Sequence, residues 1–284
     1  MSYDAFSLYY FFACRLILKK PMISKITSGL FRLFLVSLIV TSSHRTFSQE
    51  ETPKKVYHFN GNVSVTNNGF SFVPTFSLGE PATIAELSIG GKRFSFEPQF
   101  RFELKGLKPW SFIAIWRYDL IQNEKTRLRL GVHFPAFSYL KKMVEIDGVM
   151  TEIVFTQRWI TPELIFSQKL SEKVNVGAYY IHGFGLEPEG QVHNTNFLSL
   201  RMGLNIPFAK KWYFRWNPEV YYLTMDDLGG FFAAQNLALG HQKVPVYLAS
   251  TMNVSLEKDN EIPAKDFNWN ISIVYTFKLE FTRR

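Results

Sequence analysis

Only one cysteine, Cys14, occurs in the 284 residues. Without a second one, the chain can form neither a disulfide framework nor a multi-thiolate metal site. Histidine pairs at metal-ligand spacing, Gly-rich phosphate loops, nucleophile elbows and HExxH helices are also missing. The sequence therefore predicts no metal centre and no cofactor, and it offers none of the motifs of common soluble enzymes.

The net positive charge is small outside the N-terminal region. The formal net charge is +8, but residues 1–48 hold six of the 32 basic residues and one of the 24 acidic ones. Residues 49–284 are left with 26 basic and 23 acidic residues and no basic run. Because binding to nucleic acid requires a concentrated patch of Lys and Arg, we expect no nucleic-acid partner.

No apolar run is long enough to cross a bilayer as a helix, which needs about 20 residues. The apolar stretch 33–40 follows Lys25 and Arg32 and precedes Thr46-Phe47-Ser48. This order is typical of a secretory signal peptide that is cleaved near Ser48. The predicted division is an over-extended start (1–21), a signal peptide (22–48) and an exported domain (49–284).

Aromatic residues, in contrast, are abundant: 28 Phe, 13 Tyr and 6 Trp make up 17% of the chain. In the stretch 93–104, RFSFEPQFRFEL, apolar and polar residues alternate without exception. A strand places successive side chains on opposite faces, so one face would be rich in Phe and the other would carry four charges. The same alternation gives 267–281 eight apolar positions on one face.

Two architectures provide such faces: a soluble antiparallel sheet, or a membrane barrel with lipid outside and a polar lumen. The stretch 267–281 would be about 46 Å long, whereas soluble strands are usually about 17–20 Å. The apolar faces carry no charge, and Tyr and Trp recur near strand ends, as in interfacial girdles. We therefore predict an all-β fold, a transmembrane antiparallel β-barrel of about 12 strands, with 14 as the alternative.

Thirteen segments are candidate strands: 56–66, 69–78, 82–90, 92–104, 108–119, 126–137, 150–168, 173–184, 194–206, 211–224, 231–240, 243–256 and 267–281. Bacterial single-chain barrels have an even number, so at least one is wrong; 82–90 and 231–240 alternate least well. The short turns predicted on the periplasmic side are 123–124, 167–173 and 207–210. The longer links predicted on the outside are 137–150, 185–195, 224–231 and 257–266.

Four prolines lie on the apolar faces of these segments: Pro74, Pro98, Pro162 and Pro218. Proline removes a donor from the hydrogen-bond ladder, and a closed barrel has no edge strand, so we expect bulges or ladder ends at these positions. Such bulges would add curvature. Alternatively, they would aim Glu163 and Glu219 into the lumen.

The inward faces of the predicted strands are rich in charge. The candidate lumen-lining residues are Arg93, Glu97, Arg101, Glu103, Arg117, Asp119, Arg127, Arg129, Glu163, Arg201, Arg215, Glu219, Lys278 and Glu280. Because confined charges must be paired, the first interpretation is a structural ionic core of Arg–carboxylate pairs. The alternative is a narrow, Arg-lined path for anionic solutes such as carboxylates or phosphates.

Two further hypotheses remain open. Some outer-membrane barrels hydrolyse lipids with a His near a Ser; here the nearest pair is His193 and Thr195, which would share a strand face. They are weak catalytic candidates, because the hydroxyl belongs to Thr and no acid partner is evident. The other hypothesis is a periplasmic β-sandwich that binds an apolar ligand between its Phe faces.

The signal sequence before Gln49, the alternating strands and the aromatic last strand resemble small single-chain outer-membrane β-barrel proteins of Bacteroidota-type bacteria, over about 56–281. The resemblance implies a cell outer-membrane location, contact with lipid and lipopolysaccharide, and recognition of 267–281 by the barrel-assembly machinery. One departure is the end of the chain: such barrels usually end on an aromatic residue, but Phe281 is followed by Thr-Arg-Arg. The function expected is a narrow channel or a structural barrel.

Overall fold

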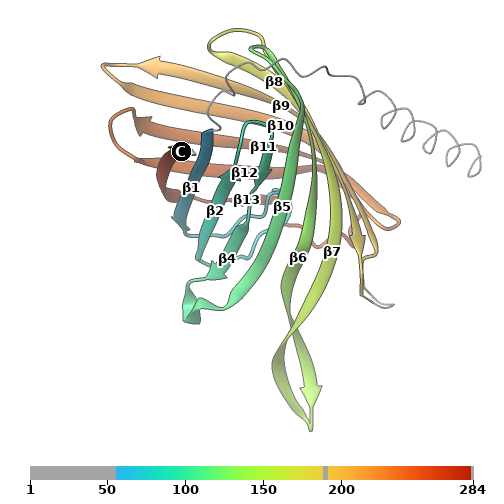
Figure 1. The fold of residues 1–284 in the computed structure, drawn as a ribbon. Coiled ribbons are helices and arrows are strands. Elements are labelled where there is room, and N and C mark those ends of the chain that lie inside the picture. Colours follow the sequence, from blue (N-terminus) through green and yellow to red (C-terminus); the bar gives the residue numbers. More distant parts are fainter. Residues whose placement is uncertain (1–55, 188–190, 283–284) are drawn as a thin grey trace, which may run out of the picture. The chain divides into compact units, whose positions relative to one another are not determined.

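A computed structural model describes residues 56–187 and 191–282. The predicted start (1–21) and signal peptide (22–48) lie outside the described residues. The strands (Figure 1) are β1 (Val56–Thr66), β2 (Ala82–Gly90), β3 (Phe94–Phe96), β4 (Gln99–Glu103), β5 (Pro109–Gln122), β6 (Thr126–Ile146), β7 (Val149–Lys169), β8 (Val174–Gly185), β9 (Asn194–Phe208), β10 (Trp212–Met225), β11 (Leu228–His241), β12 (Val246–Lys258), β13 (Phe267–Trp269) and β14 (Ser272–Thr282). A short 3-10 helix, η1 (Lys105–Leu107), precedes β5. No helix in the described part is long and apolar enough to cross a membrane.

These segments form a closed barrel of twelve antiparallel strands, because β3 with β4 and β13 with β14 are the halves of two interrupted strands. Consecutive strands pair along the sheet, and β1 pairs with β14 from Val56↔Thr282 to Thr66↔Ser272, which closes it. The predicted twelve-strand barrel is confirmed. The sandwich hypothesis is wrong, since a single sheet closes on itself.

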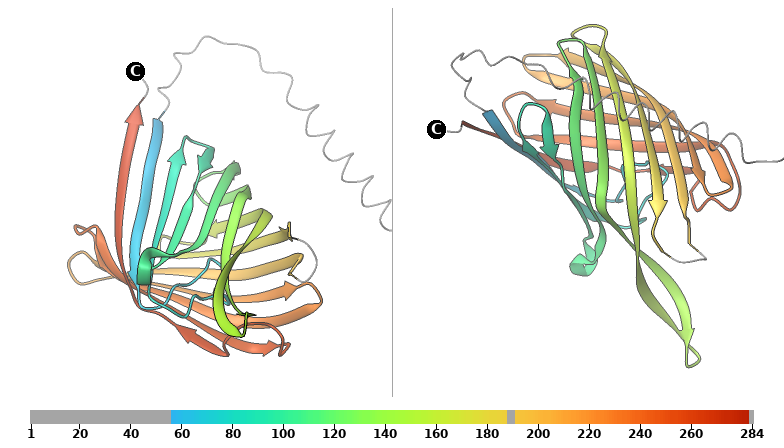
Figure 2. Two further views of the ribbon diagram at one scale, coloured as in Figure 1. Left: turned by 90° about the horizontal axis from the view of Figure 1, so that it is seen from below. Right: turned by 45° about the vertical axis from the view of Figure 1, so that its right-hand side comes forward.

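The candidate strand 69–78 is wrong. It belongs to the segment 67–81 between β1 and β2, which runs inside the ring of strands (Figure 2) and holds one isolated bridge, Phe70↔Ser77. Around Pro74 the chain turns, and the Phe76 N–H donates to the Val73 carbonyl at 3.0 Å. The two segments that alternate least well, 82–90 and 231–240, are both strands, as β2 and part of β11.

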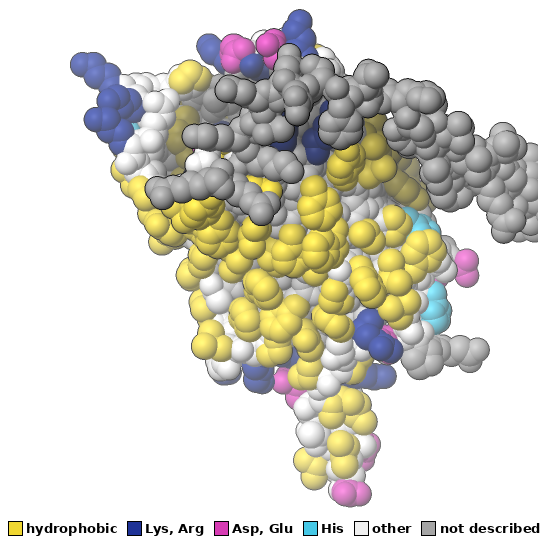
Figure 3. All heavy atoms as spheres, viewed as in Figure 1, with side chains coloured by type: hydrophobic (Ala, Val, Ile, Leu, Met, Phe, Trp, Pro, Cys, Tyr) yellow, Lys and Arg dark blue, Asp and Glu magenta, His cyan; other side chains and the backbone are white. Residues whose placement is uncertain are grey.

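The two barrel faces differ as the alternation predicts. Outward side chains are apolar and exposed, as for Leu200 (61%) and Ile273 (59%), whereas the inward Arg101 is only 2% exposed. Figure 3 shows a broad band of hydrophobic atoms on the viewed side of the barrel, with charged groups gathered toward both ends. An outer surface of this kind is suited to lipid rather than water.

Three of the four prolines expected to mark bulges interrupt the ladder without shifting its register. They are Pro98 between β3 and β4, Pro162 in β7 and Pro218 in β10. Pairing of β7 with β8 stops at Ile160↔Phe184 and resumes in the same register at Glu163↔Ile181, so Pro162 removes ladder bonds without adding a residue. Interruptions of the ladder are therefore found at these three prolines, but the register shifts fall elsewhere. One of the shifts lies at Phe134-Pro135 in β6, between His133 and Ala136. The interpretation that a proline bulge aims Glu163 or Glu219 is wrong.

The two barrel ends are unlike. The end that holds the start of β1 and the end of β14, here called the terminal end, carries the short turns 91–93, 123–125, 170–173, 209–211 and 242–245. The opposite end, the loop end, carries the longer links 67–81, 104–108, 186–193 and 259–266 and the two-residue turns 147–148 and 226–227. The predicted long links 137–150 and 224–231 are therefore wrong, because strands fill most of both. At the loop end β6 and β7 continue as a two-stranded ribbon, defined here as residues 139–156, which protrudes from the barrel (Figure 1).

Candidate functional site

Four side chains from neighbouring strands meet inside the barrel around the carboxylate of Glu163 on β7. The Tyr179 hydroxyl from β8 donates to Glu163 Oε2 at 2.7 Å, and His133 Nε2 from β6 lies 2.9 Å from the same oxygen. Arg117 from β5 donates to both oxygens, with Nη2 3.0 Å from Oε2. These residues are called the mid-lumen layer. The Glu163 side chain has no solvent exposure, and it lies over Gly131, where a Cβ atom would meet Oε1 at 2.3 Å.

An ionic wall continues from this layer along β3 to β6. Arg117 also pairs with Glu97, and Arg129 joins Glu97 to Asp119 at 3.2 and 2.9 Å. Arg127 donates two bonds to Asp119, at 2.8 and 2.6 Å. With Glu163 included, three guanidinium groups thus face three carboxylates, and the wall is electrically neutral. Charges held this way satisfy one another in a confined space.

The other predicted inward charges lie outside this wall, and only some of them are closely paired. Arg101 donates to Gln99 at 2.7 Å, but its nearest carboxylate, Glu86, is 3.8 Å away. Glu103 pairs with Lys141. Arg201 lies 3.8 Å from Glu219, and the guanidinium group of Arg215 lies over the ring of Tyr213. Lys278 pairs with Glu280 at an exposed position on β14. Arg93 is exposed in the turn before β3.

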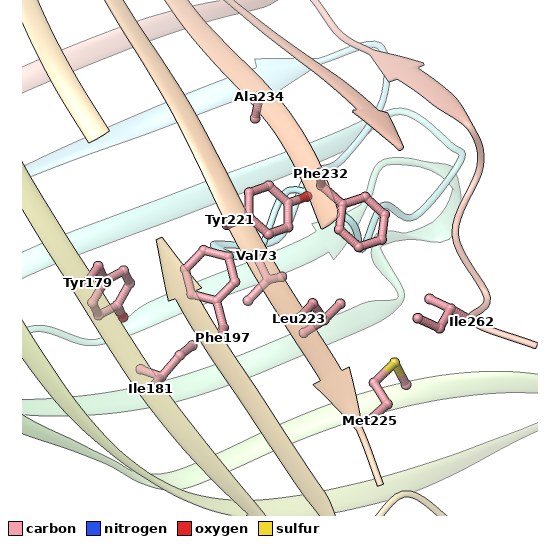
Figure 4. Close-up of a cluster of buried hydrophobic side chains, with 10 residues drawn as sticks. All are labelled: Val73, Tyr179, Ile181, Phe197, Tyr221, Leu223, Met225, Phe232, Ala234 and Ile262. Carbon is pink, nitrogen blue, oxygen red and sulfur yellow. The ribbon is translucent and has the colours of Figure 1, made fainter. Parts of the chain in front are cut away.

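The inner face of β8 to β11 carries a buried apolar cluster in addition to the charges of Arg201 and Glu219, and sequence reasoning missed this cluster. The buried cluster (Figure 4) comprises Val73, Tyr179, Ile181, Phe197, Tyr221, Leu223, Met225, Phe232, Ala234 and Ile262. A signal was present in the doubled aromatics 179–180, 221–222 and 231–232, because consecutive strand residues place one ring on each face. The rings of Tyr221 and Phe232 stack at 5.2 Å.

Segment 67–81 is fastened into this cluster. Val73 packs within it, and the hydroxyl groups of Thr75 and Tyr221 lie 2.7 Å apart. Tyr221 donates its one proton to Asn253 Oδ1 at 2.6 Å, so Thr75 is the donor to Tyr221. The segment therefore closes part of the lumen from the loop end.

Separate cavities lie on either side of the mid-lumen layer. The loop-end cavity, of about 430 Å³, has His133 in its wall together with aromatic rings and hydroxyl groups. A terminal-end cavity of about 460 Å³ has Arg117, Glu97 and Glu86 in its wall. The two share no lining residue. His133 lines one cavity, Arg117 lines the other, and both bind Glu163. One layer of side chains therefore separates the two cavities.

The structure does not bring together the two weak catalytic candidates. Thr195 lines the loop-end cavity, whereas the His193 backbone N–H donates to the Asp226 carboxylate at 3.1 Å. No hydrogen bond between the His193 ring and Thr195 occurs among the described residues. Within residues 56–187 and 191–282 there is also no group of three or more His, Cys, Asp or Glu that could hold a metal ion.

No protein-family model and no curated protein matches the sequence. Solved structures are similar: the NanC porin (12% identity, TM-score 0.50, 77% of this chain and 100% of that one), and the KdgM porin in complex with disordered oligogalacturonate (10%, 0.44, 78% and 99%). Outer-membrane-expressed OmpT of Vibrio cholerae is another (8%, 0.43, 82% and 100%). With the closed sheet and the apolar outer face, the likeness to NanC shows an outer-membrane β-barrel with transmembrane strands. It extends to the fold alone.

Proposed function

We propose that the protein is a narrow outer-membrane channel for small solutes, closed at mid-height by the layer around Glu163. The observation that carries the proposal is the pair of cavities that approach this layer from opposite ends of the lumen. A barrel with a purely structural role has no need for solute-sized spaces on both sides of one thin partition. Pockets for small molecules are typically about 300–1,000 Å³, and both cavities fall in this range.

The neutral ionic wall supports a structural rather than an anion-selecting role for the Arg residues on β5 and β6. Rings of Arg select anions when their charge is uncompensated. Here Arg117, Arg127 and Arg129 are each bound to a carboxylate. The proposed channel therefore gains little anion selectivity from this wall.

The proposed setting follows from the topology and the expected partners. The terminal end would face the periplasm and the loop end the exterior, as in single-chain bacterial barrels. The outer face would contact lipid and lipopolysaccharide. The last strand, which the structure divides into β13 and β14, would be recognised by the assembly machinery.

Single-channel conductance in planar bilayers tests the proposal. Tyr179→Ala removes the ring beside Glu163, so we expect a larger conductance than in the wild type. Tyr180→Ala is the matched control, because Tyr180 is the next residue and its exposed side chain points to the other face. Unboiled gel mobility verifies that each variant is folded. If the wild type and both variants are folded but none of them conducts ions, the result would favour a structural barrel instead.

A further inference from the structure

We infer that the loop-end cavity binds an uncharged amphipathic solute and that one face of the ribbon guides the solute into it. The inference deepens the proposed channel function, on which its transport role rests. Binding itself can be measured independently of conduction.

The cavity wall combines aromatic rings with hydroxyl groups. Phe72 and Phe76 come from the inward segment, Trp110 and Trp159 from β5 and β7, and Phe197 from β9. The hydroxyls belong to serines and threonines on several elements. Small-molecule sites are mostly apolar with a few placed polar groups, and this wall fits that description.

No Lys, Arg, Asp or Glu is among the described residues that line the cavity. A charged ligand would therefore lose its hydration without meeting a counter-charge, which is strongly unfavourable. The hydroxyls of Ser138, Thr161 and Thr195, on β6, β7 and β9, can exchange hydrogen bonds with a neutral polar group. The chemistry thus selects a molecule with a planar or apolar body and one or a few uncharged polar groups, such as a phenol or an aryl alcohol.

The ribbon gives a second, separate indication of an apolar ligand. On one of its faces, called the apolar face, six of the eight side chains are apolar. The directly opposite pairs there are Leu140 with Phe155, Lys142 with Ile153, Val144 with Thr151 and Ile146 with Val149. Val149 is 64% exposed and Ile146 is 46% exposed. These side chains lie beyond the barrel wall, so their exposure is not explained by contact of that wall with lipid, and no third strand covers them. Exposed apolar patches on parts outside the membrane usually mark binding surfaces.

The apolar face of the ribbon is continuous with the cavity. Leu140 belongs to both, because it lines the cavity and begins the ribbon's apolar face. Ser138 and Gln157, a directly paired couple just inside the ribbon, line the cavity as well. This continuity argues that the occupant of the face is the ligand of the cavity rather than a partner protein. In Figure 3 hydrophobic atoms extend along the protruding ribbon.

Isothermal titration of the barrel in lipid nanodiscs, with empty nanodiscs subtracted, tests the cavity. The probes are 2-naphthol, which is neutral at pH 7, and 2-naphthoate, which has a similar size but carries a charge. We expect 2-naphthol to bind at least about tenfold more tightly. Ser138→Trp should fill the cavity and weaken 2-naphthol binding by about tenfold or more, whereas the control Phe137→Trp, on the opposite face, should not.

Equal binding of both probes, or unchanged 2-naphthol binding in a folded Ser138→Trp variant, overturns the cavity assignment. Stopped-flow association tests the ribbon. Ile153→Asn, on the apolar face, should slow 2-naphthol association several-fold, while Val154→Asn on the other face should leave it unchanged. Equal rates in both variants overturn the guiding role and leave a partner protein as the occupant of that face. Binding without conductance would refute only the channel, and conductance without binding only this inference.

Discussion

Glu163→Gln is the sharpest perturbation of the lumen, because the substitution keeps the side-chain shape and changes only one oxygen and the charge. Glu163 receives two bonds from Arg117 and one each from His133 and Tyr179. Three of these four bonds converge on Oε2. The glutamine carbonyl should therefore take the Oε2 position, which leaves its NH₂ group facing Arg117 Nε–H, donor against donor.

The magnitude follows from what is lost and what remains. A hydrogen bond to a charged group contributes about 1.5–3 kcal/mol, and the three remaining bonds weaken when their acceptor becomes neutral. Removing one partner of a buried ion pair costs about 3–5 kcal/mol when the other charge is left alone. Arg117 is not left alone, because it keeps Glu97. We therefore expect the free energy of unfolding to fall by about 3 kcal/mol.

Urea unfolding in lipid vesicles, followed by tryptophan fluorescence, measures this change. With a slope of roughly 2 kcal/mol per molar urea, the midpoint should fall by about 1.5 M. Glu219→Gln is the matched control, because Glu219 has one partner, the partly exposed Arg201 at 3.8 Å, and should lose less than about 1 kcal/mol. Equal losses at the two positions would refute the view that the Glu163 carboxylate organises the layer.

Three further outcomes are expected. Leu200→Arg, in the middle of β9 on the outer face, should lower the free energy of unfolding by about 2–4 kcal/mol in vesicles, against about 0–1 for the same change at either rim. A double-mutant cycle of Thr75→Val and Tyr221→Phe should give a coupling of about 1 kcal/mol in urea unfolding, whereas additivity would mean that the bond does not hold the inward segment. The hydrogen bond from Arg158 keeps the pKa of Glu187, in the loop after β8, below its usual value. The Arg158–Glu187 pair should therefore persist above the ordinary pKa and be lost as pH falls through the lowered one; carboxyl NMR should show a rise of this pKa in Arg158→Gln.

Most of the barrel could be predicted from alternation because lipid and lumen impose opposite demands on successive residues. The segment 69–78 shows the limit of that logic. Phe70, Phe72, Pro74 and Phe76 alternate as a lipid-facing strand would, but this segment lies inside the ring of strands, where Phe72 packs against the lumen cluster. Alternation reports that one side of a segment is apolar. It does not identify the apolar surface that the segment contacts.

The site was less accessible to sequence reasoning. That Arg117 and Glu163 occupy inward positions follows from alternation, but their contact spans two strand pairings and depends on the register of each. Both pairings shift register at the same place, residues 134–135 of β6, between His133 and Ala136. This shift decides which charges lie at the same height in the lumen. Pro135 marks the place in the sequence, but a proline alone does not distinguish a bulge from a plain interruption of the ladder, because Pro162 and Pro218 shift nothing.

The division of the lumen explains how its closure and its ligand chemistry belong together. Segment 67–81 brings apolar residues inward, and these pack where the inner face is apolar. Val73 lies in the cluster of β8 to β11, whereas Phe72 also packs against Ile113 and Ile115 of β5. The paired charges of the ionic wall lie apart from these contacts. Phe72 and Phe76 of this segment also form part of the loop-end cavity wall. A solute in that cavity therefore contacts the same segment that closes the lumen. By linkage, any solute that binds more tightly to one position of the segment shifts the segment toward that position, and the strength of the shift is set by the difference in affinity.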